Sequence, residues 1–214
     1  MKKVIIIGAG GNGKVIASNI DDIKKKNKIE LFGFLDDSKK SSKNLRILGK
    51  ITEKNIQKYL SKKNFYFIYS LFSTKLKQNS LKKLVSLKIP QNRFINLIHP
   101  NVSISKNVKI GHGVNICSYV NVSPNVKIGN HVNIFSQSMI GHDTILEHYS
   151  YLANNAVLGA QIKVKEGAYI GMNATIREKV QIGKWSTVGM GSVVLKNINN
   201  FETVVGNPAK KIKK

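Results

Sequence analysis

A histidine and an aspartate stand side by side in the second half of this 214-residue sequence, at His142 and Asp143. A neutral imidazole accepts protons near pH 7, and a carboxylate beside it can fix its tautomer and stabilise the imidazolium. The pair could therefore serve as a general base that takes a proton from an attacking amine or hydroxyl. Most single surface histidines are inert, so the pair indicates a reaction only if the surrounding motif and fold support one.

A glycine-rich motif near the start of the chain has the spacing G-x-G-x-x-G. Its glycines are Gly8, Gly10 and Gly13, with Gly11 and Asn12 between them. Such a turn between a strand and a helix brings backbone N–H groups and a helix N-terminus to a phosphate. A purely structural glycine turn is the alternative interpretation.

Two carboxylates follow the glycine motif at the distance that ribose binding requires. Asp36 or Asp37, about twenty residues on, could accept hydrogen bonds from ribose hydroxyls. Glycines and carboxylate together suggest NAD. The first half of the chain, to about residue 95, has too few expected strands for a complete dinucleotide-binding fold with two halves, however, so we expect a smaller nucleotide-binding domain.

Other reactive residues give weaker signals. Three histidines would share one face of the parallel β-helix that a six-residue repeat in the second half predicts: His112, His131 and His148. His112 and His148 would be two coils apart, which is about 10 Å. One zinc ion, at about 2.1 Å from each ligand, cannot take both from one subunit. A metal-dependent carbonic anhydrase, which would need histidines as metal ligands, is therefore disfavoured, and no metal is expected. The single Cys117 excludes a disulfide framework within the chain, and an acyl-cysteine intermediate has no motif to support it.

The first half alternates strand and helix patterns, which predicts a small parallel α/β domain. Thr52 is expected to cap one helix, and Ser73 or Thr74 another that ends near Leu87. The expected elements are a strand at Lys3–Ile7, a helix at Gly13–Lys25, strands at Leu31–Leu35 and Phe65–Tyr69, a helix at Glu53–Ser61 and a last strand at Arg93–Ile98.

The second half has a six-residue period. Every sixth residue from Ile104 to Val194 is aliphatic, and the fourth residue after each is small or branched. This period is neither helical nor a simple strand alternation. It predicts a parallel β-helix with three short strands per coil of eighteen residues, the aliphatic side chains pointing inward.

The charge is extreme, with 35 Lys and Arg against 11 Asp and Glu and a formal net charge of +24. Basic chains often bind nucleic acid. The lysines are scattered, however, and lack the aromatic interleaving of single-strand binders, so we expect no nucleic-acid partner. The longest apolar runs are too short to span a bilayer and no signal peptide is evident, so a cytoplasmic location without membrane insertion is expected.

The six-residue repeat resembles that of the hexapeptide-repeat acyltransferases, whose coils wind left-handed, and Gly206–Lys210 resembles their closing motif. The glycine motif with Asp36-Asp37 resembles the subfamily of bacillosamine-pathway and perosamine N-acetyltransferases and sialic-acid O-acetyltransferases. The resemblance implies a Rossmann-like α/β domain at 1–95 that binds a sugar nucleotide. It also implies a left-handed parallel β-helix at 96–214 that binds acetyl-CoA in a homotrimer.

The resemblance also implies residue roles. His142 is expected to be the general base, with Asp143 orienting it, in a direct transfer of acetyl from acetyl-CoA to a sugar amine. Ala160 lies one coil from His142, near the expected thioester position. Residues on later coils are expected to line the pantetheine groove: Gly171, Met172 and Gly189.

The sequence departs from the family at four places, one of which is Ala160, where the family tends to have glycine. Asn12 and Tyr151 stand where the family usually has histidine, and Ser70–Ser73 replaces a Gly-Asn pair. Tyr151 is nevertheless expected near the substrate. The favoured acceptor is a nucleotide-linked 4-amino sugar destined for a surface glycan. O-acetylation of a sialic-acid-like sugar and a catalytically inactive trimeric scaffold remain the alternatives.

Overall fold

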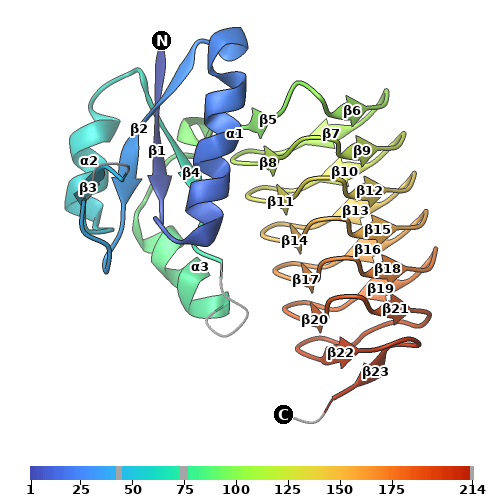
Figure 1. The fold of residues 1–214 in the computed structure, drawn as a ribbon. Coiled ribbons are helices and arrows are strands. Elements are labelled where there is room, and N and C mark those ends of the chain that lie inside the picture. The colour runs from blue at the N-terminus through green and yellow to red at the C-terminus, as the bar shows by residue number, and fades with distance from the viewer. Residues whose placement is uncertain (42–44, 73–76, 213–214) are drawn as a thin grey trace. The chain divides into compact units, whose positions relative to one another are not determined.

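The computed structural model describes residues 1–41, 45–72 and 77–212, and it divides into two compact units, Met1–Leu97 and Ile98–Lys214. The first unit is a small parallel sheet with helices, and the second is a left-handed parallel β-helix (Figure 1). The predicted fold class is thus confirmed for both halves.

The first unit contains a four-stranded parallel sheet in the order β3-β2-β1-β4, with β1 in the interior. Helix α1 packs on this sheet through Ile16, Ile20 and Ile23, which are 0–1% exposed. The elements are β1 (Lys2–Ile7), α1 (Gly11–Asn27), β2 (Ile29–Leu35), β3 (Ile47–Gly49), α2 (Glu53–Leu60), β4 (Phe65–Tyr69), α3 (Lys77–Ser86) and the 3₁₀ turn η1 (Gln91–Arg93).

The carboxyl ends of three strands meet at one edge of this sheet. Ile7 of β1 lies beside Leu35 of β2 on one side and Tyr69 of β4 on the other. The loops that follow these strands therefore leave the sheet together. In open parallel sheets this edge is where ligands bind.

The second unit has three faces built from parallel strands, except that the last strand of the chain is antiparallel, and we name them the β5, β6 and β7 faces after their first strands. The β6 face contains β6 (Ser103–Ile104), β9 (Asn121–Val122), β12 (Met139–Ile140), β15 (Val157–Leu158), β18 (Thr175–Ile176) and β21 (Val193–Val194). The β7 face contains β7 (Lys109–Ile110), β10 (Lys127–Ile128), β13 (Ile145–Leu146), β16 (Lys163–Val164) and β19 (Gln181–Ile182). The β5 face contains β5 (Leu97–Ile98), β8 (Asn115–Ile116), β11 (Asn133–Ile134), β14 (Tyr151–Leu152), β17 (Tyr169–Ile170), β20 (Thr187–Val188), β22 (Thr203–Val205) and β23 (Lys210–Lys211).

From β5 to β18, each short strand pairs with the strand eighteen residues further along, as the six-residue period predicts, whereas the pairing of Thr187 with Thr203 spans sixteen residues. Ile140 lies beside Leu158, for example, and Leu158 beside Ile176. These aliphatic side chains are at most 2% exposed and form one continuous core with their neighbours. The small or branched residues four places after each aliphatic position are buried as well from Val114 onward, and the Ser138 hydroxyl donates to the Ala153 carbonyl at 3.0 Å.

In the first half, one element prediction needs correction and one strand was missed. The strand expected at Arg93–Ile98 is wrong over most of its length, because Gln91–Arg93 forms a 3₁₀ turn and only Leu97–Ile98 is a strand, which pairs in the β5 face. Strand β3 was not predicted, since three residues carry too little pattern. Thr52 caps α2 as expected, accepting from the Asn55 N–H. The expected caps Ser73 and Thr74 lie outside the described residues.

Within the described residues, no helix is long and apolar enough to cross a membrane.

Candidate active site and nucleotide pocket

His142 and Asp143 lie at the corner between strands β12 and β13, where the chain passes from the β6 face to the β7 face. Asp143 has a left-handed backbone with φ of 57°, which makes the tight turn. The His142 Nδ1 and Asp143 Oδ2 atoms are 2.6 Å apart. The side chains are 54% and 46% exposed, so the imidazole is accessible to a substrate.

This contact determines which ring nitrogen can act as a base. An ionised carboxylate only accepts hydrogen bonds, so Nδ1 of His142 carries the proton and Nε2 keeps a free lone pair. Hydrogen bonds from His142 and then from Asn125 hold the pKa of Asp143 below its usual value. Asp143 is therefore ionised at neutral pH, and Nε2 is ready to accept a proton.

The coil that follows continues the same corner. The Gln161 N–H donates to the His142 carbonyl at 2.8 Å, which places Ala160 and Gln161 one coil beyond His142 and Asp143. The stacking is tight, because a Cβ atom on Gly141 would lie 2.4 Å from the Gly159 carbonyl oxygen. This register places Ala160 next to His142 on the following coil, where the sequence predicts it.

The four residues expected to bind the cofactor do not share one corner. Ala160 lies with His142 between the β6 and β7 faces, whereas Gly171, Met172 and Gly189 follow β5-face strands at the corner between the β5 and β6 faces. Gly171 and Gly189 are stacked so closely that a Cβ atom on Gly171 would lie 2.7 Å from the Gly189 carbonyl carbon. The two groups flank the β6 face from opposite sides.

Tyr151 lies on the β5 face, which is opposite the corner that carries His142. Its ring stacks on Tyr169 with centroids 5.2 Å apart and packs against Phe135 at 4.8 Å. Burial, with smaller contributions from Tyr169 and Cys117, raises the pKa of Tyr151. Within one chain the fold therefore does not bring Tyr151 to His142.

A ladder of three histidines, His112, His131 and His148, lies at the corner between the β7 and β5 faces. The Asn130 N–H donates to Nδ1 of His148 at 2.8 Å, and the Asn130 side-chain oxygen accepts from the His112 N–H at 2.9 Å. The His131 ring is buried and stacks on Tyr149 at 5.0 Å. The described residues contain no group of three or more His, Cys, Asp or Glu placed to hold a metal ion.

Cys117 is buried on the β5 side of the β-helix and accepts a hydrogen bond from the Asn115 side chain at 3.4 Å.

In the first unit, the glycines of the motif divide into two groups. Gly8 has φ of +107°, and a Cβ atom on Gly13 would lie 2.2 Å from the Gly8 carbonyl oxygen, so both serve the close approach of α1 to β1. Gly10 and Gly11 have no atom within 4 Å of such a Cβ position. The open backbone of Gly10, Gly11 and Asn12 at the start of α1 is therefore where a phosphate could approach.

The two neighbouring aspartates have different partners. Asp36 is 7% exposed and accepts from the N–H groups of Ala9, Ser38 and Lys39. Burial alone would raise its pKa, but these hydrogen bonds outweigh it and the pKa of Asp36 lies below the usual value. Asp36 thus joins the glycine loop to the end of β2.

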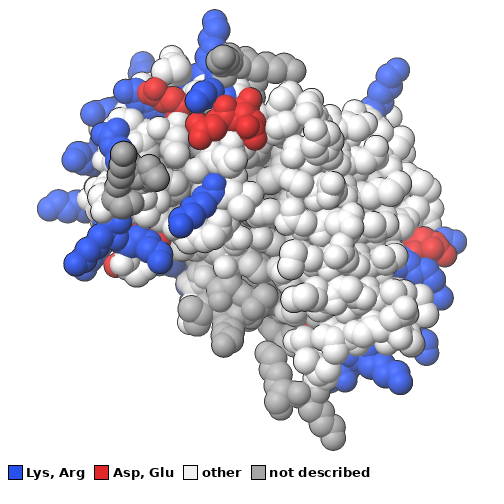
Figure 2. Space-filling view, in the orientation of Figure 1, with Lys and Arg blue, Asp and Glu red and all other residues white. Residues whose placement is uncertain are grey.

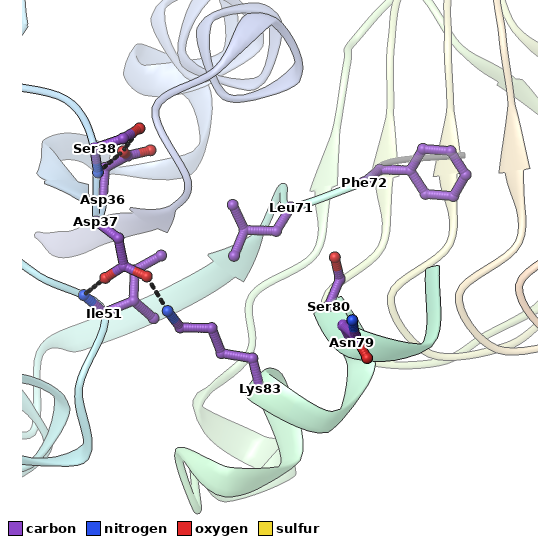
Figure 3. A pocket seen from close by; sticks show the side chains of 9 residues that line it. All are labelled: Asp36, Asp37, Ser38, Ile51, Leu71, Phe72, Asn79, Ser80 and Lys83. Carbon is purple, nitrogen blue, oxygen red and sulfur yellow. Dashed lines mark hydrogen bonds and ion pairs between the residues drawn. The ribbon is translucent and has the colours of Figure 1, made fainter. Parts of the chain in front are cut away.

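Asp37 faces a pocket of about 320 Å³ at the same sheet edge (Figure 3). One of its oxygens accepts from the Ile51 N–H at 2.9 Å, and the other pairs with Lys83 of α3. Leu71, which follows β4, also lines the pocket. The remaining lining residues are Asp36, Ser38, Phe72, Asn79 and Ser80.

Lys83, Asn79 and Ser80 were missed from the sequence. They lie on one helix in a lysine-rich stretch, and only the packing of α3 beside β4 and the end of β2 shows that they share a pocket. Asn125 was also missed, although its position eighteen residues before Asp143 was the available signal.

Positive charge is concentrated in the first unit. Residues 1–97 contain 22 Lys and Arg against 6 Asp and Glu, whereas residues 98–214 contain 13 against 5. In the view of Figure 2, basic side chains gather over the first unit, and much of the visible β-helix surface is uncharged. This unit therefore suits an anionic ligand.

Comparison with known families assigns both halves. The model of the PglD N-terminal domain matches residues 3–84, and the bacterial transferase hexapeptide model of six repeats matches residues 161–196. The model of the GMPPB C-terminal domain matches residues 88–172. A search of curated protein sequences gives no match.

Several solved structures share the whole fold. The acetyltransferase domain of PglB from Neisseria gonorrhoeae is 25% identical, with a TM-score of 0.84 over 99% of this chain and 100% of that one. A histidine-to-asparagine variant of perosamine N-acetyltransferase from Caulobacter crescentus, solved with CoA and GDP-perosamine, is 22% identical, with a TM-score of 0.86 over 100% and 98%. WeeI from Acinetobacter baumannii is 24% identical, with a TM-score of 0.81 over 99% and 100%.

These matches cover the glycine-loop domain and the β-helix together. The chain therefore contains a PglD-type N-terminal domain at residues 3–84 and bacterial transferase hexapeptide repeats at residues 161–196.

Proposed function

We propose that this protein transfers an acetyl group from acetyl-CoA to the amino group of a nucleotide-linked amino sugar, with a 4-amino sugar as the favoured acceptor. The observation that carries the proposal is the exposed His142–Asp143 pair, whose geometry leaves Nε2 free to accept a proton. The similar PglB domain has been solved with acetyl coenzyme A, and the perosamine enzyme with CoA and GDP-perosamine.

The reaction follows from the chemistry of this pair. The sugar amine attacks the thioester carbonyl of acetyl-CoA, and Nε2 of His142 accepts the proton that the amine loses. The tetrahedral intermediate then expels the CoA sulfur, which takes that proton from the His142 imidazolium and leaves as the thiol, so that the imidazole is neutral again. Asp143 stabilises the imidazolium between these steps. The products are the N-acetylated sugar nucleotide and free CoA.

We assign one ligand to each unit from the residues that its surface presents. The pocket with Asp37 and Lys83, beside the open glycines at the start of α1, suits a nucleoside diphosphate. Ala160, Gly171, Met172 and Gly189 flank the β6 face and are proposed to hold the pantetheine arm. Acetyl-CoA as donor is consistent with a reaction in the cytoplasm.

The experiment that tests the function is a panel of UDP-, GDP- and dTDP-linked amino sugars, GDP-perosamine among them, together with a sialic-acid-like sugar as the hydroxyl acceptor, each assayed with acetyl-CoA for release of free CoA. We expect turnover with at least one 4-amino sugar nucleotide. Turnover only with a hydroxyl acceptor would replace N-acetylation by O-acetylation. No turnover with any acceptor, together with no thermal shift by acetyl-CoA, would support the inactive scaffold.

Replacing Lys83 by Ala is expected to raise the KM for the sugar nucleotide about ten- to a hundredfold, because a hydrogen bond to a charged group contributes roughly 1.5–3 kcal/mol. The KM for acetyl-CoA should not change. Lys82→Ala removes an exposed lysine from the same helix without affecting the pocket, and it is the matched control. An unchanged KM for the sugar nucleotide in Lys83→Ala would remove this pocket from substrate binding.

We also propose that the active unit is a homotrimer. Large apolar side chains are exposed on and beside the β6 face: Met139 at 49%, Met172 at 43%, Met190 at 74% and Leu195 at 40%. Tyr151 and His142 lie on opposite sides of one β-helix, so they can meet only across a subunit boundary.

Light scattering at assay concentration should give three times the chain mass of 23.8 kDa. A stable, active monomer would contradict the trimer and leave Tyr151 without a place in the site.

A further inference from the structure

The carboxylate that orients His142 is itself held by a third side chain. Asn125 lies one coil before Asp143 at the same corner, and its Nδ2 atom donates to Asp143 Oδ1 at 3.1 Å. The other oxygen, Oδ2, contacts His142 Nδ1 at 2.6 Å. The three side chains therefore form a continuous chain of hydrogen bonds that ends at the imidazole.

The backbone of the β-helix holds the first two members of this chain at a constant spacing. Asn125 and Asp143 both have left-handed backbones, with φ of 62° and 57°, and the Asp143 N–H donates to the carbonyl of Pro124 at 3.1 Å. The amide orientation also follows from chemistry, because an amide oxygen turned toward the carboxylate would repel it.

We propose that Asn125 is a positioning residue of the acetyltransferase site, which acts through Asp143 to keep the proton of His142 on Nδ1. Without the Asn125 amide, Asp143 can rotate about its side-chain bonds toward solvent, since it is 46% exposed. The imidazole would then populate the tautomer with its proton on Nε2, which cannot accept a proton there. The expected effect on kcat rests on the proposed function, whereas the expected tautomer of His142 does not.

The tautomer is measured directly, without any substrate. In protein labelled with ¹⁵N at histidine, the ring-nitrogen shifts of His142, assigned by their loss in His142→Gln, should show the proton on Nδ1 at neutral pH. In Asn125→Gly, which tolerates the left-handed backbone, we expect a mixture of the two tautomers. An unchanged tautomer in Asn125→Gly would overturn the proposal whether or not the protein is an acetyltransferase.

A matched control lies one coil earlier. Asn107 has the same left-handed backbone, with φ of 62°, at the same corner, and it is two coils from Asp143. Asn107→Gly therefore makes the same change to the backbone at a site that cannot reach the carboxylate. The His142 tautomer should be that of the wild type in this variant, and a shift equal to that of Asn125→Gly would indicate a general loosening of the corner.

Kinetics with an accepted sugar nucleotide give the second readout. We expect Asn125→Gly to lower kcat roughly three- to tenfold with the KM for acetyl-CoA unchanged. Asn125→Asp, which places a second acceptor against Oδ1, should lower it further. In the Asp143→Asn background, Asn125→Gly should have no additional effect, because the residue through which it acts is already changed. Additive losses would contradict the proposal.

Discussion

His142→Ala is expected to lower turnover by roughly 10²- to 10⁴-fold, the usual contribution of a positioned general base. The affinity for acetyl-CoA should barely change, because the side chain is proposed to act on the sugar amine and not on the cofactor. The residual rate should rise with pH, since a deprotonated amine attacks without assistance. Steady-state kinetics across pH and a binding measurement for acetyl-CoA check these three expectations.

Asp143→Asn should cost less than removal of the base. Asparagine tolerates the left-handed backbone of this corner, so the fold is kept and only the orientation of the imidazole is lost. The order of the two variants is therefore a prediction in itself. A larger loss in Asp143→Asn than in His142→Ala would contradict the roles assigned to them.

The sequence supplies a matched control for this experiment. Ile110-Gly111-His112 repeats the local sequence Ile140-Gly141-His142 at another corner, and both histidines are exposed, but Gly113 stands where Asp143 would be. His112→Ala should leave kcat unchanged. Near-wild-type turnover of His142→Ala on a verified acceptor would end the proposed mechanism, although the fold would stand.

His131 is expected to make the protein lose stability as the pH falls from about 6.5 to about 4. Its ring is 5% exposed and stacked on Tyr149, and burial, followed by the neighbouring His148 and His112, lowers its pKa from 6.5 to about 4. Between these values the unfolded chain binds a proton that the folded chain does not, so protonation favours unfolding. Above pH 6.5 both states are neutral at this residue and its effect is constant.

The size of the effect follows from the shift. One pKa unit corresponds to 1.36 kcal/mol, so the loss attributable to His131 amounts to roughly 3 kcal/mol over this range. The measurement is the free energy of unfolding, or the apparent Tm, from pH 8 to pH 4. Carboxylates also titrate in this range, so the quantity to follow is the difference between wild type and a His131 variant.

His131→Asn keeps a residue that tolerates the left-handed backbone of this corner, where φ is 57°. The variant should be less stable than wild type at pH 7, because the ring stacking is lost, and the two stability curves should converge as the pH falls toward 4. Parallel curves would show that His131 titrates normally in the folded protein.

The repeat shows how much the sequence determined on its own. An aliphatic residue at every sixth position, with a small or branched residue four places after it, predicts one short strand and one turn per six residues, and hence the coil, its eighteen-residue register and the core. Ile140, Leu158 and Ile176 lie where this reasoning places them. The exposed corner position of His142 beside Asp143 follows from the same count.

The tertiary structure decided which residues meet across coils and elements. Asn125 reaches Asp143, and Lys83 reaches Asp37, because parallel stacking and helix packing bring together side chains that are 18 and 46 residues apart. Tyr151 and His142 are nine residues apart in sequence, yet the three-sided coil turns them to opposite sides. The local period of a chain determines its turns, whereas the partners of a side chain depend on where those turns carry it.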